Sequence, residues 1–197
     1  MGETLLDHTS KFGPKVSYVR STLLSSSIET LKTLGYYERY LELLPEEHHD
    51  TILLTLAPTW HPIGLAMAHY HACDELGLAE DELRHIGESV SGRIMGTFLG
   101  TVMRSSRNAG ASPWIALKKY DKLWDRLMQG GGVRVYEEGP KDAIVETHGL
   151  PLLEHRYFMV AYAGVIKGAT GMFAKTVHVN PRRPPDRHAA RTSVSWV

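Results

Sequence analysis

Residues 130–145, which read GGGVRVYEEGPKDAIV, decide the fold because they end a long helical pattern and begin an extended one. The three glycines at the start interrupt the helical repeat, since glycine destabilises a helix interior. β-branched residues lie on both sides of the turn-forming run 138–142: Val133, Val135, Ile144 and Val145. This arrangement predicts a β-hairpin with a longer turn.

Downstream of the hairpin, the sequence predicts one more helix and a closing pair of strands. The helix is expected over residues 152–173 because its apolar side chains recur at helical spacing. The strands are expected over residues 176–179 and 192–196, joined by a proline-rich loop. Trp196 indicates that the final strand is tied into the sheet rather than frayed.

Upstream of the hairpin, the sequence predicts a series of helices. Their expected ranges are 21–34, 36–44, 45–57, 63–76, 80–107 and 114–129. The order of helices, hairpin, helix and strand pair is typical of an α+β fold, with the helical N-terminal half packed on a small four-stranded antiparallel sheet. No long linker divides the chain, so residues 1–197 are expected to form a single domain. Its parts are an N-terminal arm (1–20), a helical part (21–129) and the hairpin–helix–strand-pair part (130–197).

The composition is that of an ordinary globular domain. The chain has 197 residues, of which 43% are hydrophobic and 22% charged, with 22 basic and 22 acidic side chains. These values exclude intrinsic disorder, and the balanced charge gives no reason to expect a nucleic-acid partner. The single cysteine, Cys73, suits a reducing compartment. We find no signal peptide and no run of the ~18 apolar residues that a membrane helix needs, so we expect a cytoplasmic protein without a membrane span.

Glycines, prolines and aromatic residues of the C-terminal half carry a family resemblance. They lie in the runs Leu123-Trp-Asp-Arg, Gly130-Gly-Gly, Glu138-Gly-Pro, Gly149-Leu-Pro-Leu, Tyr157-Phe and Gly164, with Val19-Arg-Ser and Trp60-His-Pro consistent upstream. With these runs the chain resembles a paralogous family of uncharacterised myxobacterial proteins. That family in turn resembles the 4-vinyl-reductase-type sensor domains, which share a fold with haem–nitric-oxide-binding domains and with the small subunits of the TRAPP tethering complex.

The resemblance implies a ligand-holding or partner-binding domain, often dimeric, in which helices and sheet enclose an apolar pocket. Many vinyl-reductase-type sensors also have a structural zinc site with cysteines in the last strand pair. The corresponding positions here lie near Arg183 and Ala190, and neither residue is a cysteine. We therefore expect the zinc site to be absent.

Two stripes of glycine suggest where such a pocket lies. Gly92, Gly96 and Gly100 recur every four residues in one predicted helix, and Gly164 and Gly168 do so in the last helix. The stripes indicate either close helix–helix packing or a groove for a flat ligand or a partner helix, with Ile94 among its walls. The pocket-lining candidates, from this pattern together with the resemblance, are Trp60, Met95, Gly96, Phe98, Gly100, Met103, Tyr157 and Met159.

The eleven histidines are the one compositional oddity. His69 and Cys73 are four residues apart, a spacing that can chelate a metal, but no third ligand follows at a helical step. We therefore predict no metal site, with these two residues as weak candidates. A single axial histidine for haem is an alternative, although the chain lacks the Tyr-x-Ser-x-Arg haem-propionate motif of the gas-sensing fold. The expectation is accordingly that there is no cofactor.

The favoured function is a non-enzymatic sensory or binding domain that holds a small apolar ligand, as a homodimer. A first alternative is a protein-interaction or scaffolding domain without a ligand, in which the glycine stripes form a dimer seam. Others are a haem- or gas-binding sensor and a biosynthetic accessory enzyme that uses His69, His71 or His85 in acid–base chemistry. The sequence pairs no nucleophile with a base, so we predict no catalytic residue.

Overall fold

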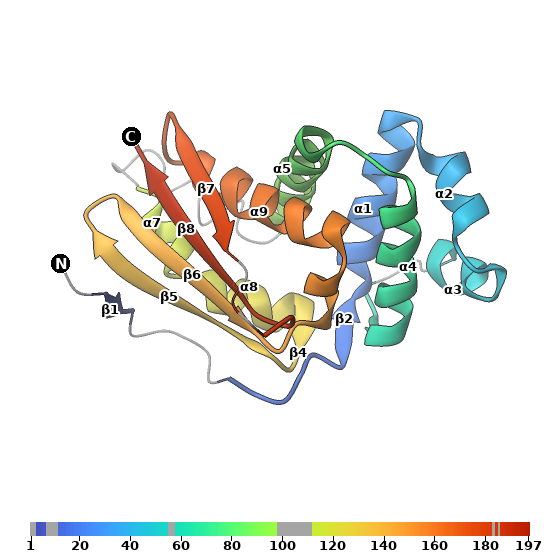
Figure 1. Ribbon diagram of the computed structural model, residues 1–197, viewed down its shortest axis with the longest axis horizontal. Helices are drawn as coiled ribbons and strands as arrows, with labels where there is room; N and C mark the ends of the chain where they lie inside the picture. Colours follow the sequence, from blue (N-terminus) through green and yellow to red (C-terminus); the bar gives the residue numbers. More distant parts are fainter. Residues whose placement is uncertain (1–2, 7–11, 55–57, 98–111, 183, 185) are drawn as a thin grey trace.

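The computed structural model describes residues 3–6, 12–54, 58–97, 112–182, 184 and 186–197, and for residues 95–97 the backbone only. It is an α+β structure, as the sequence predicts. An antiparallel sheet forms one side of the molecule, α9 lies against it, and α5, α1 and α4 follow beyond α9 (Figure 1). Helices α2 and α3 lie at the end farthest from the sheet.

The main sheet has the strand order β1-β5-β6-β8-β7, and every neighbouring pair is antiparallel. Its strands are β1 (Thr4–Leu5), β5 (Gly132–Gly139), β6 (Asp142–His148), β7 (Val177–Arg182) and β8 (Ala190–Trp196). The predicted hairpin is present, with Val135 opposite Val145, and its register shifts between Glu137 and Gly139. Buried residues alternate along β8, so one face of the sheet is packed against the helices.

Two features of the strands differ from the sequence prediction. The predicted four strands are joined by a fifth, β1, which pairs at the edge with β5. A second sheet of three short strands, β2 (Tyr18–Arg20), β3 (Trp60–Pro62) and β4 (Met128–Gln129), has the order β3-β2-β4. Strands of two or three residues are too short to show an alternating pattern, so they could not be predicted from the sequence.

Most helices lie where they were predicted, with shorter bounds. They are α1 (Ser21–Leu34), α2 (Tyr37–Leu43), the 3₁₀ turn η1 (Glu46–His48), α3 (His49–Leu53), α4 (Ile63–Glu75), α5 (Glu80–Thr97), α7 (Trp114–Leu117), α8 (Tyr120–Leu127), the 3₁₀ turn η2 (Pro151–Glu154) and α9 (Arg156–Gly171). The predicted helix 114–129 is two helices, and the predicted helix 152–173 begins as a 3₁₀ turn. The last part of the predicted helix 80–107 lies outside the described residues.

Helices α5 and α9 pack backbone to backbone along a seam of small residues. A Cβ atom added to Gly164 would lie 2.3 Å from the carbonyl oxygen of Arg84, and one added to Gly168 would lie 2.8 Å from the Cβ of Ser91. Gly87 on α5 is as tightly placed, since its added Cβ would be 1.9 Å from the carbonyl oxygen of Ala161. Close helix–helix packing, one of the two interpretations of the stripes, therefore accounts for Gly164 and Gly168.

The α5 glycine in that seam is not one of the predicted stripe. An added Cβ at Gly92 meets no atom within 4 Å, so Gly92 does not contribute to the packing. Because Gly164 and Gly168 contact α5 of the same chain, they give no support to a seam between two chains.

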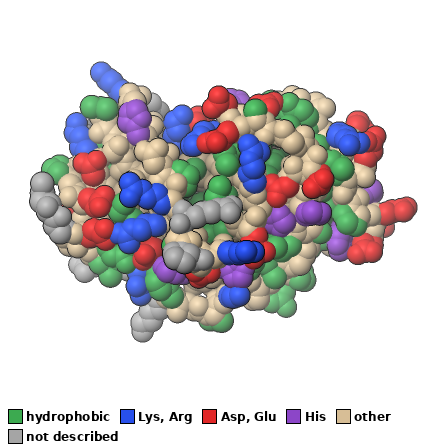
Figure 2. All heavy atoms as spheres, viewed as in Figure 1, with side chains coloured by type: hydrophobic (Ala, Val, Ile, Leu, Met, Phe, Trp, Pro, Cys, Tyr) green, Lys and Arg blue, Asp and Glu red, His purple; other side chains and the backbone are tan. Residues whose placement is uncertain are grey.

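The surface carries both signs of charge. On the face shown in Figure 2, basic and acidic side chains are interspersed, in keeping with the formal net charge of zero. Among the described residues, no helix is long and apolar enough to cross a membrane.

Candidate functional site

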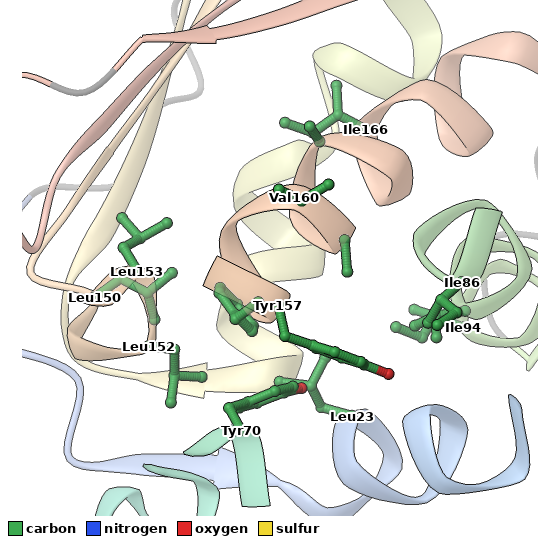
Figure 3. Packing of buried hydrophobic residues seen from close by; sticks show 14 of the residues in the cluster. Leu23, Tyr70, Ile86, Ile94, Leu150, Leu152, Leu153, Tyr157, Val160 and Ile166 are labelled. Carbon is green, nitrogen blue, oxygen red and sulfur yellow. The ribbon is translucent and has the colours of Figure 1, made fainter. Parts of the chain in front are cut away.

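An apolar cavity lies between α1, α5, α8 and α9, with Tyr70 of α4 at one end. Its volume is about 50 Å³. Figure 3 shows the rings of Tyr70 and Tyr157 beside Leu23, with Ile86 and Ile94 of α5 directed toward the same region. The lining residues are mostly aliphatic or aromatic: Leu23, Ser27, Tyr70, Ile86, Gly87, Val90, Ile94, Tyr120, Leu123, Trp124, Leu127, Met128, Tyr157, Phe158, Ala161, Tyr162 and Val165.

One wall of the cavity is made of aromatic rings in mutual contact. The ring of Tyr70 meets that of Phe158 edge to face, with centroids 4.9 Å apart, and lies 5.9 Å from that of Tyr157. The ring of Phe158 stacks on that of Tyr162 at 5.8 Å. Aromatic pairs in these geometries stabilise each other beyond the burial of their area, so this wall is firmly held.

At the Tyr70 end, the otherwise apolar lining includes two hydroxyl groups. The Ser27 hydroxyl and the Tyr157 hydroxyl, both in the lining, hydrogen-bond with each other at 3.1 Å. Ser27 Oγ also hydrogen-bonds with His69 Nε2 at 3.1 Å, and His69 Nδ1 hydrogen-bonds with the Tyr40 hydroxyl at 2.7 Å. The four side chains form a continuous buried network that runs from the cavity to α2.

Burial sets the charge state of this network. It lowers the pKa of His69 to about 3, so the imidazole is neutral at physiological pH. Burial also raises the pKa of the Tyr40, Tyr157 and Tyr70 hydroxyls, which are therefore protonated. The Tyr70 end of the cavity thus offers neutral hydroxyl groups that can both donate and accept hydrogen bonds.

The predicted site residues are placed in several parts of the molecule. Tyr157 lines the cavity, whereas Trp60 lies on an adjoining groove. Met159 is partly buried against the core and is not among the cavity-lining residues. Met95 and Gly96 lie in α5, where the structure describes their backbone only. Three other candidates lie outside the described residues: Phe98, Gly100 and Met103.

Sequence reasoning missed Ser27 and the contribution of α8. Ser27 lies four residues after Leu23 on the apolar face of α1, and a buried hydroxyl on an apolar face was the available signal. Tyr120, Trp124 and Leu127 of α8 recur at helical spacing, a pattern that predicts a helix and does not point to a site. With Leu123 they are largely buried and line the cavity.

The histidine candidates for metal binding or catalysis are separated. Cys73 Sγ lies 3.7 Å from His69 Nε2, but the two ring nitrogens of His69 are engaged by Ser27 and Tyr40. His71 and His85 are exposed. Among the described residues, no group of three or more His, Cys, Asp or Glu side chains could hold a metal ion.

Comparison with known proteins assigns the fold. No protein-family model and no curated protein matches the chain. Solved structures of H-NOX domains match most of it. An Fe(II) unliganded H-NOX protein from K. algicida has 8% sequence identity and a TM-score of 0.64, over 90% of this chain and 96% of that one.

Two other matches are an H-NOX variant from T. tengcongensis and an oxygen-binding H-NOX domain related to soluble guanylate cyclases. The first has 13% identity and a TM-score of 0.59, over 89% of this chain and 96% of that one. The second has 15% identity and a TM-score of 0.54, over 89% of this chain and 94% of that one. The chain therefore has the H-NOX fold. Of the relatives that the sequence resemblance implied, the haem–nitric-oxide-binding domains are the ones these structures support.

The expectation of no cofactor is wrong for this fold. One matching structure, at 13% identity, comes from work on heme redox potential and porphyrin distortion, and another is described as an Fe(II) H-NOX protein. The glycines, prolines and aromatic residues of the sequence indicated the fold, but they did not indicate the cofactor named for the matching structures.

Proposed function

We propose that this chain is a non-enzymatic sensory domain that binds a small ligand in the cavity between α1, α5, α8 and α9. The observation that carries the proposal is an apolar cavity in the core with Ser27 and Tyr157 hydroxyls at one end. Ligand sites in proteins commonly combine apolar walls with a few placed polar groups that orient the ligand. The H-NOX fold supports a sensory role, since one of the matching domains is described as binding oxygen.

Haem requires an apolar pocket of sufficient volume and a side chain that ligates its iron. The cavity has aromatic and aliphatic walls, which suit a flat apolar group. Its described residues include no histidine and no cysteine, and a volume of about 50 Å³ is far below the ~300 Å³ at which sites for drug-sized ligands begin. The lining as it stands does not fit haem. Haem would fit only if the surrounding helices separated, and the lining residues present to contact its iron would be Met128 and the tyrosines.

A tyrosinate ligand would act against its surroundings. Burial raises the pKa of Tyr120 and Tyr157, which opposes loss of their protons. We therefore propose a small molecule with an apolar body as the ligand of this cavity.

Native mass spectrometry of the freshly purified protein, with and without added haem, tests the proposal. It reports ligand mass and the number of subunits together, and an absorbance spectrum shows a Soret band if haem is bound. Val165 lines the cavity on α9. Its replacement in V165F fills the cavity, and we expect this variant to lose the bound molecule.

The matched control is M159F, which enlarges a partly buried side chain of the same helix that does not line the cavity. We expect M159F to retain the ligand. The proposal is wrong if the purified protein and the haem-treated protein carry no ligand, and no small apolar compound raises the melting temperature. It is equally wrong if V165F binds as the parent does.

A further inference from the structure

A second hollow adjoins the cavity on the surface. This groove has a volume of about 580 Å³ and is lined by Arg20, Thr22, Pro58, Trp60, Ile94, Leu123, Asp125, Arg126 and Leu127. Its described lining is therefore mixed, with five apolar residues, one threonine, and two arginines against one aspartate. The cavity beside it is almost wholly apolar.

Arg20 is the best-placed cation in the groove. Its guanidinium carbon lies 4.8 Å from the centre of the Trp60 ring, a cation–π arrangement that fixes the side chain against the groove wall. Within the described part of the chain, Arg20 forms no ion pair with an acid. It precedes α1, whose first turn contains no acidic residue, so the positive end of that helix adds to the same charge.

The groove and the cavity share a wall. Ile94, Leu123 and Leu127 line both of them, so among the described residues these three aliphatic side chains lie between the two spaces. Arg20, the last residue of β2, borders the groove, while Leu23 and Ser27 of the adjoining α1 border the cavity. A molecule that moved these side chains aside would have its polar end at Arg20 and its apolar end among the aromatic rings.

We infer that the ligand is an amphiphilic carboxylate, with its carboxylate in the groove at Arg20 and Arg126, its apolar body along Ile94, Leu123 and Leu127, and the end of that body in the cavity. This inference rests on the proposed function, because the apolar body occupies the cavity. A guanidinium binds a carboxylate by charge-assisted hydrogen bonds, which are stronger than neutral ones. Asp125 in the same lining disfavours a second negative charge, so a monoanion is the better match.

Three probes with the same alkyl chain test the head group. Octanoate, 1-octanol and octylamine differ in charge but share the apolar body, and isothermal titration calorimetry gives the affinity of each. We expect octanoate to bind about tenfold or more tightly than 1-octanol, and octylamine to bind most weakly. We also expect added salt to lower the affinity for octanoate and to leave the affinity for 1-octanol unchanged, because the groove is open to solvent.

Variants locate the head group. R20Q and R126Q should each lower the affinity for octanoate by about five- to tenfold and leave the affinity for 1-octanol within about twofold of the parent value. K122Q is the matched control, since it removes the same charge from an exposed residue of α8 that does not line the groove. We expect it to bind octanoate as the parent does. If R20Q fails to fold, the affinity of R126Q for octanoate decides the test.

The outcomes separate this inference from the proposed function. If octanoate and 1-octanol bind equally and neither arginine variant changes the affinity for octanoate, the head-group site is wrong and the cavity site stands. The same holds if octylamine binds best. If no probe binds and the purified protein carries no ligand, the proposed cavity function fails with it.

Discussion

His69 shows how one side chain is fixed by its surroundings rather than by its sequence neighbours. It is fully buried, and its two ring nitrogens hydrogen-bond with Ser27 and Tyr40, which lie 42 and 29 positions away along the chain. The sequence showed only the four-residue spacing to Cys73. Its partners come from other helices, so the tertiary fold had to be known before the neutral network could be recognised.

The neutral state of His69 predicts that the protein loses stability in mild acid. Its pKa is about 3 in the folded chain and ~6.5 in the unfolded chain, so below pH ~6.5 the unfolded state binds more protons. Stability is therefore full above pH ~6.5 and falls by about 1 kcal/mol per pH unit as the pH decreases toward about 4. Urea unfolding at about pH 7.5 and about pH 5 measures this loss.

The variant H69Q serves as the comparison for this slope. It is less stable at every pH because the network is broken, but its free energy of unfolding should change less between the two pH values. Burial also lowers the pKa of His61. In H69Q this second histidine should leave a smaller dependence of stability on pH, with the same sign. Asp74 has a lowered pKa, so its stabilising contribution is lost only in stronger acid, below its ordinary range. An unchanged slope in H69Q would contradict the assignment.

At the scale of elements, the sequence predicted those with a clear period and missed those without one. The hairpin, α9 and the last strand pair have turn residues or helical repeats that specify them locally. The α5–α9 seam depends on Gly87, Ser91, Gly164 and Gly168, and only the two on α9 were singled out. A glycine in a helix looks the same in sequence whether it meets a backbone or faces open space, as Gly164 and Gly92 show.

These two glycines predict opposite effects of the same substitution. In G164A the new Cβ would lie 2.3 Å from the Arg84 carbonyl oxygen and 3.0 Å from Gly87 Cα, so α5 and α9 must move apart. We expect a loss of ~1–3 kcal/mol in the free energy of unfolding, as for other overpacked cores. In G92A the Cβ meets no atom within 4 Å, and alanine's higher helix propensity should add up to ~1 kcal/mol.

Chemical denaturation of the two variants beside the parent protein checks both signs in one experiment. Equal destabilisation by G164A and G92A would show that helix propensity does not decide the effect at Gly92. A stable G164A would mean that the seam is looser than its contacts indicate.

At the scale of the whole molecule, the last strand of the chain lies inside the sheet rather than at its edge. β8 pairs with β6 on one side and with β7 on the other. Val194 lies opposite Ala143 and Val179, and the Trp196 ring meets that of Trp114 at 5.0 Å. The sequence predicted that the final strand belongs to the sheet, but its central position follows from long-range pairing.

This position predicts that a short C-terminal truncation is severely destabilising. Removal of residues 193–197 takes away the second half of β8, so both β6 and β7 lose ladder partners and Trp114 loses its aromatic neighbour. We expect the melting temperature to fall by more than ~10 °C, or cooperative unfolding to disappear, in a calorimetric scan. Removal of residues 1–5 is the control of equal length, since Thr4 and Leu5 pair only with β5 at the edge of the sheet. If the two truncations lowered the melting temperature equally, the central position of β8 would not be what sustains the fold; a larger fall for the C-terminal one ties the integrity of the sheet to β8, which pairs with β7, the strand that α9 contacts.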